Sequence, residues 1–223
     1  MPSFRQPAIW CAFSADPGID EGTLCRSRSP SPGFFGAEPE PATLRPVPPH
    51  PSVRMSDDKT VISGLLYPLE VPATADYHTG PRRFGSDRKD DKGHKRLHAG
   101  IDLYAPAGTV VRAMADGVVI RVAYFYCKTW AIEVDHGCFL ARYGEVDPSK
   151  ENIFVKAGQS VSRGQRLGLV GKLVGVKVPS NMLHLELYTS TNAAELTIEA
   201  NAPFQRRSDL MDPTRSMDQA VHE

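Results

Sequence analysis

Leucine occupies every second position of residues 183–187, the clearest periodic pattern in the chain. Successive side chains of a β-strand point to opposite faces, so a period of two predicts a strand with one face in the core. One face carries Leu183, Leu185 and Leu187, and the other carries Met182, His184, Glu186 and Tyr188. The pattern therefore predicts a half-buried strand that presents His184 away from the core.

Short apolar runs separated by turn residues continue from position 65 onward. Residues 109–115 lead through Asp116-Gly117 into 118–122, and an Asp-Gly pair is a strong hairpin signal. Residues 131–135 turn at His136-Gly137 into 139–143, and further short strands are expected near 161 and at 167–170. This spacing predicts an all-β fold, either an antiparallel sheet or a small barrel-like sandwich (a barrel-sandwich hybrid). Residues 201–212 are expected to be a surface extension that packs back on the sheet.

The ends of the chain differ in composition from its middle. Residues 1–54 are rich in Pro, Ser, Arg and Gly without periodicity, so we expect a disordered tail. A domain is expected over 55–212, and residues 213–223 form a C-terminal tail or short helix. One hypothesis is that translation starts at Met55. We find no classical signal peptide and no apolar run long enough to span a bilayer.

Charge and cysteine content narrow the function classes. Lys+Arg and Asp+Glu both number 26, so no global field attracts nucleic acid or an anionic membrane, and we expect a monomer without nucleic-acid partners. Cys127 and Cys138 flank the strand expected at 131–135, which places them too far apart for a disulfide, so both are predicted to be free thiols. The basic stretch 82–96 also holds aspartates and is interpreted first as a solvated loop, and second as a cleft wall.

A candidate zinc site is formed by His98, Asp102 and His184. Two histidines and one carboxylate leave one position of a tetrahedral Zn²⁺ open, which is typical of catalytic sites. Residues four apart on an extended strand lie roughly 13 Å apart. His98 and Asp102 can therefore share a metal only if the backbone turns between them, and we expect Gly100 to permit that turn.

Residues 84–188 resemble the lysostaphin-type (LytM-like) zinc metalloendopeptidases, which cut peptides in bacterial peptidoglycan. The matching blocks occur in the expected order: Phe84-Gly85 with Arg88 nearby, 98–109, 115–119, 133–137, 155–165 and 183–187. The resemblance implies the lysostaphin-type fold, bound Zn²⁺, peptidoglycan as partner and His98, Asp102 and His184 as ligands. A rival resemblance, to lipoyl and biotinyl carrier domains, leaves these three residues unexplained and lacks the lysine at the Asp-Gly turn.

Two histidines that in this family transfer the proton and stabilise the tetrahedral intermediate are absent from this chain. The family's Tyr-x-His-Leu block is Tyr143-Gly144-Glu145-Val146 in this chain, and Met182 replaces the histidine two residues before the last ligand. Glu145 is our candidate for the base. The alternative is a degenerate domain that keeps zinc but only binds peptidoglycan or activates another hydrolase.

Further residues are candidates for the metal's surroundings or the cleft. Glu186 shares the face of His184 and is a candidate to orient its imidazole. Tyr143, His136 and Arg88 are candidates for the surroundings or the cleft, although His136 at a strand end also has a purely structural interpretation. The implied substrate places the activity in the periplasm or cell envelope. We therefore expect non-classical export or delivery into another cell.

Overall fold

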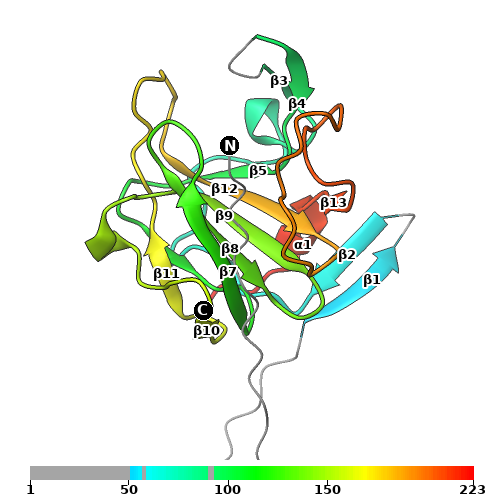
Figure 1. The fold of residues 1–223 in the computed structure, drawn as a ribbon, viewed down its shortest axis with the longest axis vertical. Coiled ribbons are helices and arrows are strands. Elements are labelled where there is room, and N and C mark those ends of the chain that lie inside the picture. Colours follow the sequence, from blue (N-terminus) through cyan, green and yellow to red (C-terminus); the bar gives the residue numbers. More distant parts are fainter. Residues whose placement is uncertain (1–50, 57–58, 90–92) are drawn as a thin grey trace, which may run out of the picture. The chain divides into compact units, whose positions relative to one another are not determined.

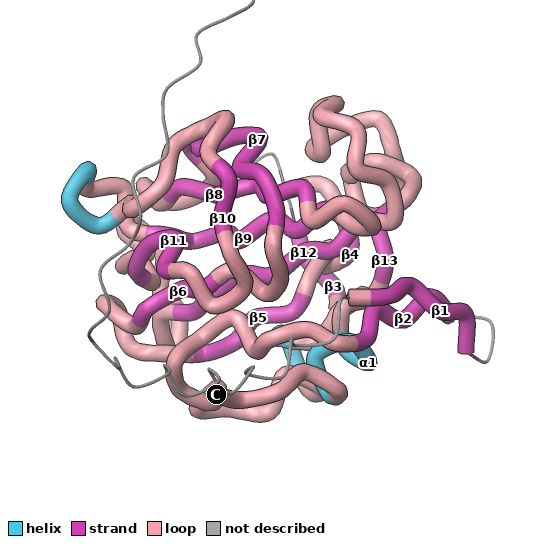
Figure 2. Tube along the Cα trace, turned by 90° about the horizontal axis from the view of Figure 1, so that it is seen from below, coloured by secondary structure: helices cyan, strands magenta, loops and turns pink. Residues whose placement is uncertain are grey.

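The structure, a computed structural model, describes residues 51–56, 59–89 and 93–223, within a compact unit that begins at Pro46. Most of the expected disordered tail, with Cys11 and Cys25, lies outside the described residues. Antiparallel strands dominate the described part of the chain, as Figures 1 and 2 show, which confirms the predicted all-β class. No helix in these ranges is long and apolar enough to cross a membrane.

A seven-stranded sheet forms the centre of the unit. Its strand order is β10 (Ser160–Val161), β7 (Gly117–Tyr124), β8 (Trp130–Asp135), β9 (Leu140–Val146), β12 (Met182–Tyr188) and β13 (Leu210–Met211). A seventh strand, β5 (Ile101–Tyr104), pairs with the first half of β12, whereas β13 pairs with the last two residues of β12. This arrangement makes β12 a central strand between β9 and β5 (Figure 1).

Three two-stranded sheets surround the large one. They pair β1 (Ser52–Ser56) with β2 (Lys59–Ser63), β3 (Asp87–Lys89) with β4 (Lys95–Leu97), and β6 (Val110–Arg112) with β11 (Arg166–Leu169). Within the described residues, the helical elements are two 3₁₀ turns, η1 (Gly80–Arg82) and η2 (Lys150–Asn152), and one helix, α1 (Thr214–Asp218). Helix α1 buries Ser216, whose Oγ accepts a hydrogen bond from the amide of Ile62 at 3.0 Å.

The hairpin predicted at Asp116-Gly117 is wrong. Strand β6 pairs with β11 in a small sheet, whereas β7 pairs with β8 and β10 in the large one. Gly117 does not adopt the left-handed backbone that a tight Asp-Gly turn requires. It is glycine because β8 approaches closely: a Cβ there would lie 2.4 Å from the carbonyl oxygen of Asp135. The chain therefore crosses between sheets at this point.

Other predicted elements are confirmed. Strands β8 and β9 form the hairpin expected around His136-Gly137, with Val134 opposite Ala141. The 201–212 extension packs back on the sheet, since β13 pairs with β12 and the side chain of Arg206 is buried. Cys127 and Cys138 are free thiols.

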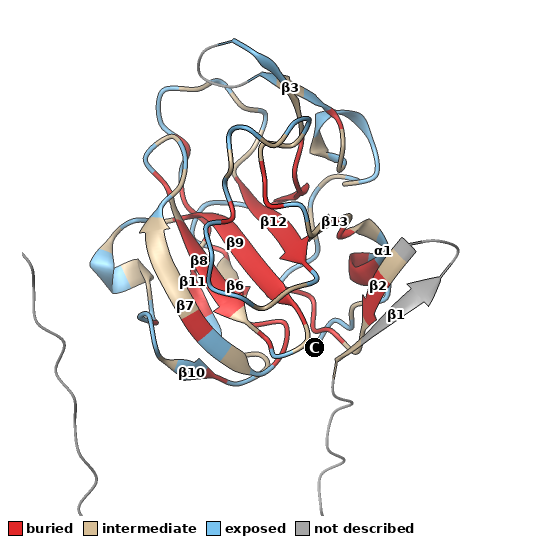
Figure 3. Cartoon of the chain, turned by 45° about the vertical axis from the view of Figure 1, so that its right-hand side comes forward, coloured by how far each residue is buried: buried red, intermediate tan, exposed pale blue. Residues whose placement is uncertain are grey.

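The half-buried character predicted for β12 is wrong, because every one of its residues is buried. Its leucines belong to the main core cluster, together with Ile101 and Val119. The opposite face, which carries His184 and Glu186, is covered as well, and Figure 3 shows β9 and β12 as the most uniformly buried strands. The alternation correctly separated the two faces, but the polar face points into a second interior rather than to solvent.

A β-bulge interrupts the pairing of β8 with β9. Trp130 lies opposite Val146, whereas Ile132 lies opposite Tyr143, so β9 contains one extra residue in this stretch. Glu145 in the bulge has a left-handed backbone with φ of 63°. Bulges change the direction of a side chain, so Glu145 is released from the alternation that the rest of β9 follows.

Candidate metal centre

Three side chains from different elements converge beside β12. His98 follows β4, Asp102 lies on β5, and His184 on β12 is the direct cross-strand neighbour of Asp102. The backbone turns between His98 and Asp102 as predicted, because β4 and β5 belong to different sheets. Gly100 permits this by close packing rather than by a left-handed backbone: a Cβ there would lie 2.3 Å from the carbonyl oxygen of Leu185.

The donor atoms of the three residues form a nearly equilateral triangle. His98 Nε2 lies 3.1 Å from His184 Nδ1, and Asp102 Oδ1 lies 3.0 Å from each of these nitrogens. In a tetrahedral zinc site, with ligands at about 2.0–2.1 Å, neighbouring ligand atoms are roughly 3.3 Å apart. The triangle is slightly smaller than this, so these donors fit one Zn²⁺ with a fourth position left for water or substrate.

Hydrogen bonds on the far side of each imidazole set its tautomer. His98 Nδ1 lies 2.9 Å from the carbonyl oxygen of Arg83, which can only accept, so Nδ1 carries the proton and Nε2 presents its lone pair. Burial lowers the pKa of His98, which favours this neutral form. His184 Nε2 donates to Glu186 Oε1 at 3.0 Å and leaves Nδ1 for the metal. Such outer partners orient metal-binding imidazoles.

Glu186 is fully buried and lies at the centre of a charged network. Its oxygens accept from Arg206 Nε at 2.8 Å, Arg142 Nη1 at 3.0 Å and the Tyr188 hydroxyl at 2.6 Å. Burial alone raises the pKa of Glu186, but the charges of Arg206 and Arg142 and the hydrogen bond from His184 hold it well below its ordinary value. Glu186 thus lies behind the imidazole of His184, on the side away from Asp102.

Arg142 extends this network away from the metal site. Its Nε and Nη2 donate to Glu133 Oε1 at 3.0 and 2.8 Å, so the guanidinium is held between two carboxylates. Neither Arg142 nor Arg206 was identified from the sequence. Arg142 directly precedes the resemblance block 143–146, but its ion pairs depend on which strands lie beside β9. Arg206 lies outside every matched block and carried no sequence signal.

Arg88, a candidate from the sequence, donates from Nη2 to Asp102 Oδ2 at 3.1 Å. This leaves the other oxygen, Oδ1, facing the two imidazoles. Burial raises the pKa of Asp102, but the His184 and His98 rings, which can donate to Oδ1 while no metal takes their lone pairs, hold this pKa well below its ordinary range. Asp102 therefore presents an ionised oxygen to the site.

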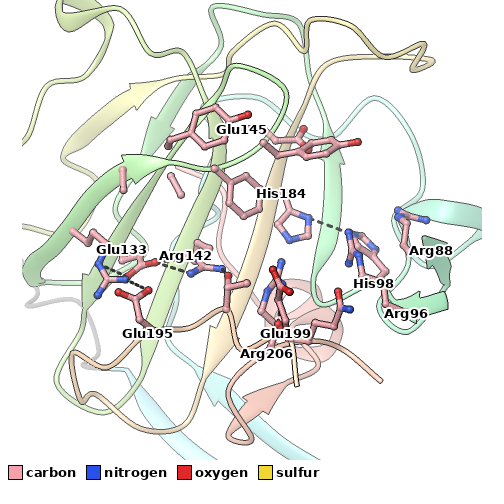
Figure 4. Close-up of a pocket in the computed structure, with 18 of the residues that line it drawn as sticks. Arg88, Arg96, His98, Glu133, Arg142, Glu145, His184, Glu195, Glu199 and Arg206 are labelled. Carbon is pink, nitrogen blue, oxygen red and sulfur yellow. Dashed lines mark hydrogen bonds and ion pairs between the residues drawn. The ribbon is translucent and has the colours of Figure 1, made fainter. Parts of the chain in front are cut away.

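A cleft of about 530 Å³ opens over the three donors, and Glu145 lines it (Figure 4). Within the described residues, Glu145 Oε2 is buried without a hydrogen-bond partner. Burial, with a smaller contribution from the charge of Asp102, raises the pKa of Glu145 to about 8. An unpartnered carboxyl in such a cleft is costly for stability and is the arrangement expected of a group that exchanges a proton with substrate.

The tip that follows β7 covers His184. The Phe125 ring stacks on its imidazole with 5.4 Å between centroids, and the guanidinium carbon of Arg142 lies 5.6 Å from the centre of the same ring. Gly144 permits this contact, since a Cβ there would lie 2.8 Å from Phe125 Cε1. Phe125 therefore shields the imidazole from water, a role that sequence reasoning missed.

Three other sequence candidates lie away from the three donors. Tyr143 and His136 were candidates for the surroundings of the metal or the cleft, but they line neither. The Tyr143 hydroxyl lies 3.0 Å from His136 Nε2 and accepts from the amide of Met114, because alternation on β9 directs Tyr143 into the main core. Met182 does not line the cleft either; it packs against Tyr104 and Leu173.

Comparison with known proteins finds relatives of this part of the chain. Residues 96–196 match the model of Peptidase family M23. The chain is 33% identical over 131 residues to "Peptidoglycan DD-endopeptidase ShyA" of Vibrio cholerae serotype O1, covering 56% of this chain and 29% of that protein. It is also 33% identical over 135 residues to an "Uncharacterized metalloprotease" of Haemophilus influenzae, covering 60% and 26%.

The chain thus spans less than a third of the length of these two relatives. Among solved structures, it is similar to a zinc-containing peptidase from Vibrio cholerae, with 26% identity and a TM-score of 0.41 over 61% of this chain and 43% of that one.

Proposed function

We propose that this protein is a zinc-dependent endopeptidase that hydrolyses peptide bonds in the stem peptides or cross-bridges of bacterial peptidoglycan. One observation carries the proposal: the triangle of donors from His98, Asp102 and His184 shares a cleft with Glu145, whose Oε2 is buried without a hydrogen-bond partner among the described residues. The match to Peptidase family M23 and the similarity to a peptidoglycan endopeptidase support the substrate class. Such a substrate places the activity in the periplasm or cell envelope.

The chain's own residues supply binding, orientation and proton transfer. When bound, Zn²⁺ lowers the pKa of a water molecule and polarises the scissile carbonyl. Glu145 Oε2 accepts a proton from the attacking water as the carbon–oxygen bond forms, and returns it to the leaving nitrogen as the carbon–nitrogen bond breaks. In the metal-free protein burial keeps Glu145 protonated near neutral pH. A nearby divalent cation favours the ionised form that a base requires.

The test is release of soluble fragments from purified peptidoglycan by the full chain, with zinc content measured on the same sample. Chelation should abolish release, and one equivalent of zinc should restore it. His184→Ala should bind zinc poorly and release nothing above background. Fragment release that survives complete removal of the metal would contradict the proposal, and the fragment masses would identify the bond.

A second candidate function is favoured by Met182. The family's histidine at this position is replaced by a side chain packed against Tyr104 and Leu173, which can neither transfer a proton nor donate to an oxyanion. The alternative is a zinc-binding domain that binds peptidoglycan or activates another hydrolase. The double variant Glu145→His/Met182→His separates the two functions: activity found only in the double variant would favour the binder, and activity in the natural chain would exclude it.

A further inference from the structure

Like charges face each other across the β3–β4 hairpin. Arg88 lies opposite Arg96, and Lys89 lies opposite Lys95, so two successive cross-strand pairs are cationic. Directly opposed like charges destabilise a β-ladder. The hairpin therefore carries an unfavourable charge arrangement that its fold does not require, at the entrance to the candidate metal centre.

Three of these four cations line the cleft over the metal centre: Arg88, Lys89 and Arg96. Arg206 lines the same cleft from a different part of the chain. Figure 4 shows Arg96 and Arg206 on the opposite side of His184 from Glu145. The cleft thus has a proton-accepting carboxyl on one side of the candidate ligands and a cationic group on the other.

The nearest described carboxylates are already engaged with other partners. Arg88 pairs with Asp102, and Arg206 pairs with Glu186. Arg96 is half-buried and its Nη1 donates to the carbonyl oxygen of Leu97. Burial and the charges of Arg206 and Arg88 lower the pKa of Arg96, which shows that the site is electropositive, although the guanidinium stays charged. Glu199, which is exposed, lines the same cleft.

We propose that Arg96, flanked by Arg88 and Arg206, binds a carboxylate of an acidic peptide beside the metal centre. The proposal rests on the proposed function and adds to it a preference for substrates with a free carboxylate. A planar guanidinium suits a carboxylate because it can donate two parallel hydrogen bonds. The bound anion would also offset the repulsion between Arg88 and Arg96.

The position of Arg96 sets where this carboxylate lies in the substrate. Arg96 precedes the candidate ligand His98 by two residues, a separation of roughly 7 Å in an extended chain. A peptide lying along the cleft would cover this distance with about two residues. The recognised carboxylate should therefore lie in the part of the substrate that occupies the cleft on the side of His184 away from Glu145.

Binding to the zinc-loaded full chain tests the subsite. The probes are a soluble peptidoglycan stem tetrapeptide with its carboxylates free and the same peptide with every carboxylate converted to a carboxamide. We expect the natural protein to bind the acidic form at least 10-fold more tightly, because a charge-assisted hydrogen bond contributes about 1.5–3 kcal/mol. Arg96→Gln should bind both forms alike, whereas Arg96→Lys should keep a reduced preference.

Lys95→Gln is the matched control, because it removes one positive charge from the same hairpin at an exposed residue that does not line the cleft. This variant should keep the preference for the acidic peptide. Equal binding of the two peptides by the natural protein would overturn the proposal. So would an equal loss of preference in Lys95→Gln and Arg96→Gln, because it would show attraction by overall charge. Arg96→Gln is compared only after its unfolding transition and zinc content match the natural protein, and Arg96→Lys provides the comparison if they do not.

Binding and hydrolysis fail independently in this design. If the protein prefers the acidic peptide but releases no fragments from peptidoglycan, the carboxylate subsite is supported and the proposed function is refuted. If it releases fragments but binds both peptides equally, the proposed function is supported and the subsite is refuted.

Discussion

Glu186→Gln tests whether the buried network behind His184 supports the metal site. Glutamine has the same shape and keeps an oxygen for His184 Nε2 and Arg206 Nε. Its amide, however, places a donor where Oε2 now accepts from Arg142 Nη1 and the Tyr188 hydroxyl. The substitution also removes the only charge that Arg206 is seen to pair with among the described residues.

The expected loss follows from these contacts. Breaking one partner of a buried ion pair costs about 3–5 kcal/mol, and Arg142 keeps Glu133, so we expect about 3 kcal/mol for Glu186→Gln. For a domain of this size, each kcal/mol shifts Tm by roughly 2–4 °C, so Tm should fall by roughly 6–12 °C. Replacing the carboxylate behind a metal-binding imidazole with a neutral amide, in a network whose other donors are disturbed, should weaken zinc binding by about 10–100-fold.

Two assays measure the effect: thermal unfolding of the metal-free protein, and competition for zinc against a chromophoric chelator. Glu133→Gln is the control, since it disturbs the same network one residue further from the metal. It should reduce stability and leave zinc affinity nearly unchanged. If Glu186→Gln binds zinc within twofold of the natural protein, Glu186 does not orient His184 and the reasoning is refuted.

Three further predictions concern pH and packing. Burial lowers the pKa of His136 to about 4, so below pH 6.5 the unfolded chain binds a proton that the folded chain does not bind. The free energy of unfolding should therefore fall by about 3 kcal/mol between pH 6.5 and 4, and His136→Gln should reduce this dependence on pH when unfolding is measured in urea. Burial raises the pKa of Glu145 to about 8, so the folded metal-free protein keeps a proton that the unfolded chain releases, and the free energy of unfolding should fall as the pH rises from 4.5 to 8. Between pH 4.5 and 7, the free energy of unfolding of metal-free Glu145→Gln should therefore rise by about 3 kcal/mol relative to that of the natural protein. If plots of this free energy against pH are parallel for the two proteins, the prediction is contradicted. Gly100→Ala places a Cβ 2.3 Å from the Leu185 carbonyl oxygen and 3.0 Å from His184 Cε1, so it should lower the free energy of unfolding by at least about 2 kcal/mol and weaken zinc binding. Unfolding and zinc titrations that match those of the natural protein would show instead that the backbone moves to accommodate the methyl group.

The candidate ligands His98, Asp102 and His184 could be selected from the sequence by residue type and spacing, and the structure brings their donor atoms together. The direction of Glu145 could not, since it depends on an extra residue in β9 that is visible only once β8 is paired with it. The same limit explains the wrong hairpin at Asp116-Gly117: Gly117 is required by the close approach of β8 and not by a tight turn, and β6 and β7 pair with β11 and β8 instead of with each other. Strand partners are set by the whole fold and not by local sequence.

The charged support of the site was equally inaccessible. Arg206 reaches Glu186 across 20 positions of the chain, and Arg142 reaches it from a neighbouring strand. Neither pairing follows from a periodic pattern, because both depend on which strands are adjacent. The face of β12 that carries His184 was predicted to be polar and exposed, yet the arginines and Phe125 turn it into a buried polar interior.

The most direct test of the account is the rate at which zinc-loaded Glu145→Gln releases soluble fragments from purified peptidoglycan, beside the natural chain. Glutamine keeps the shape of the side chain and removes its ability to accept a proton. We predict full zinc content and a rate at least about 100-fold lower, the contribution expected of a general base. Equal rates with equal zinc content would contradict the role of Glu145, and no fragments from either protein would favour a domain that only binds the cell wall.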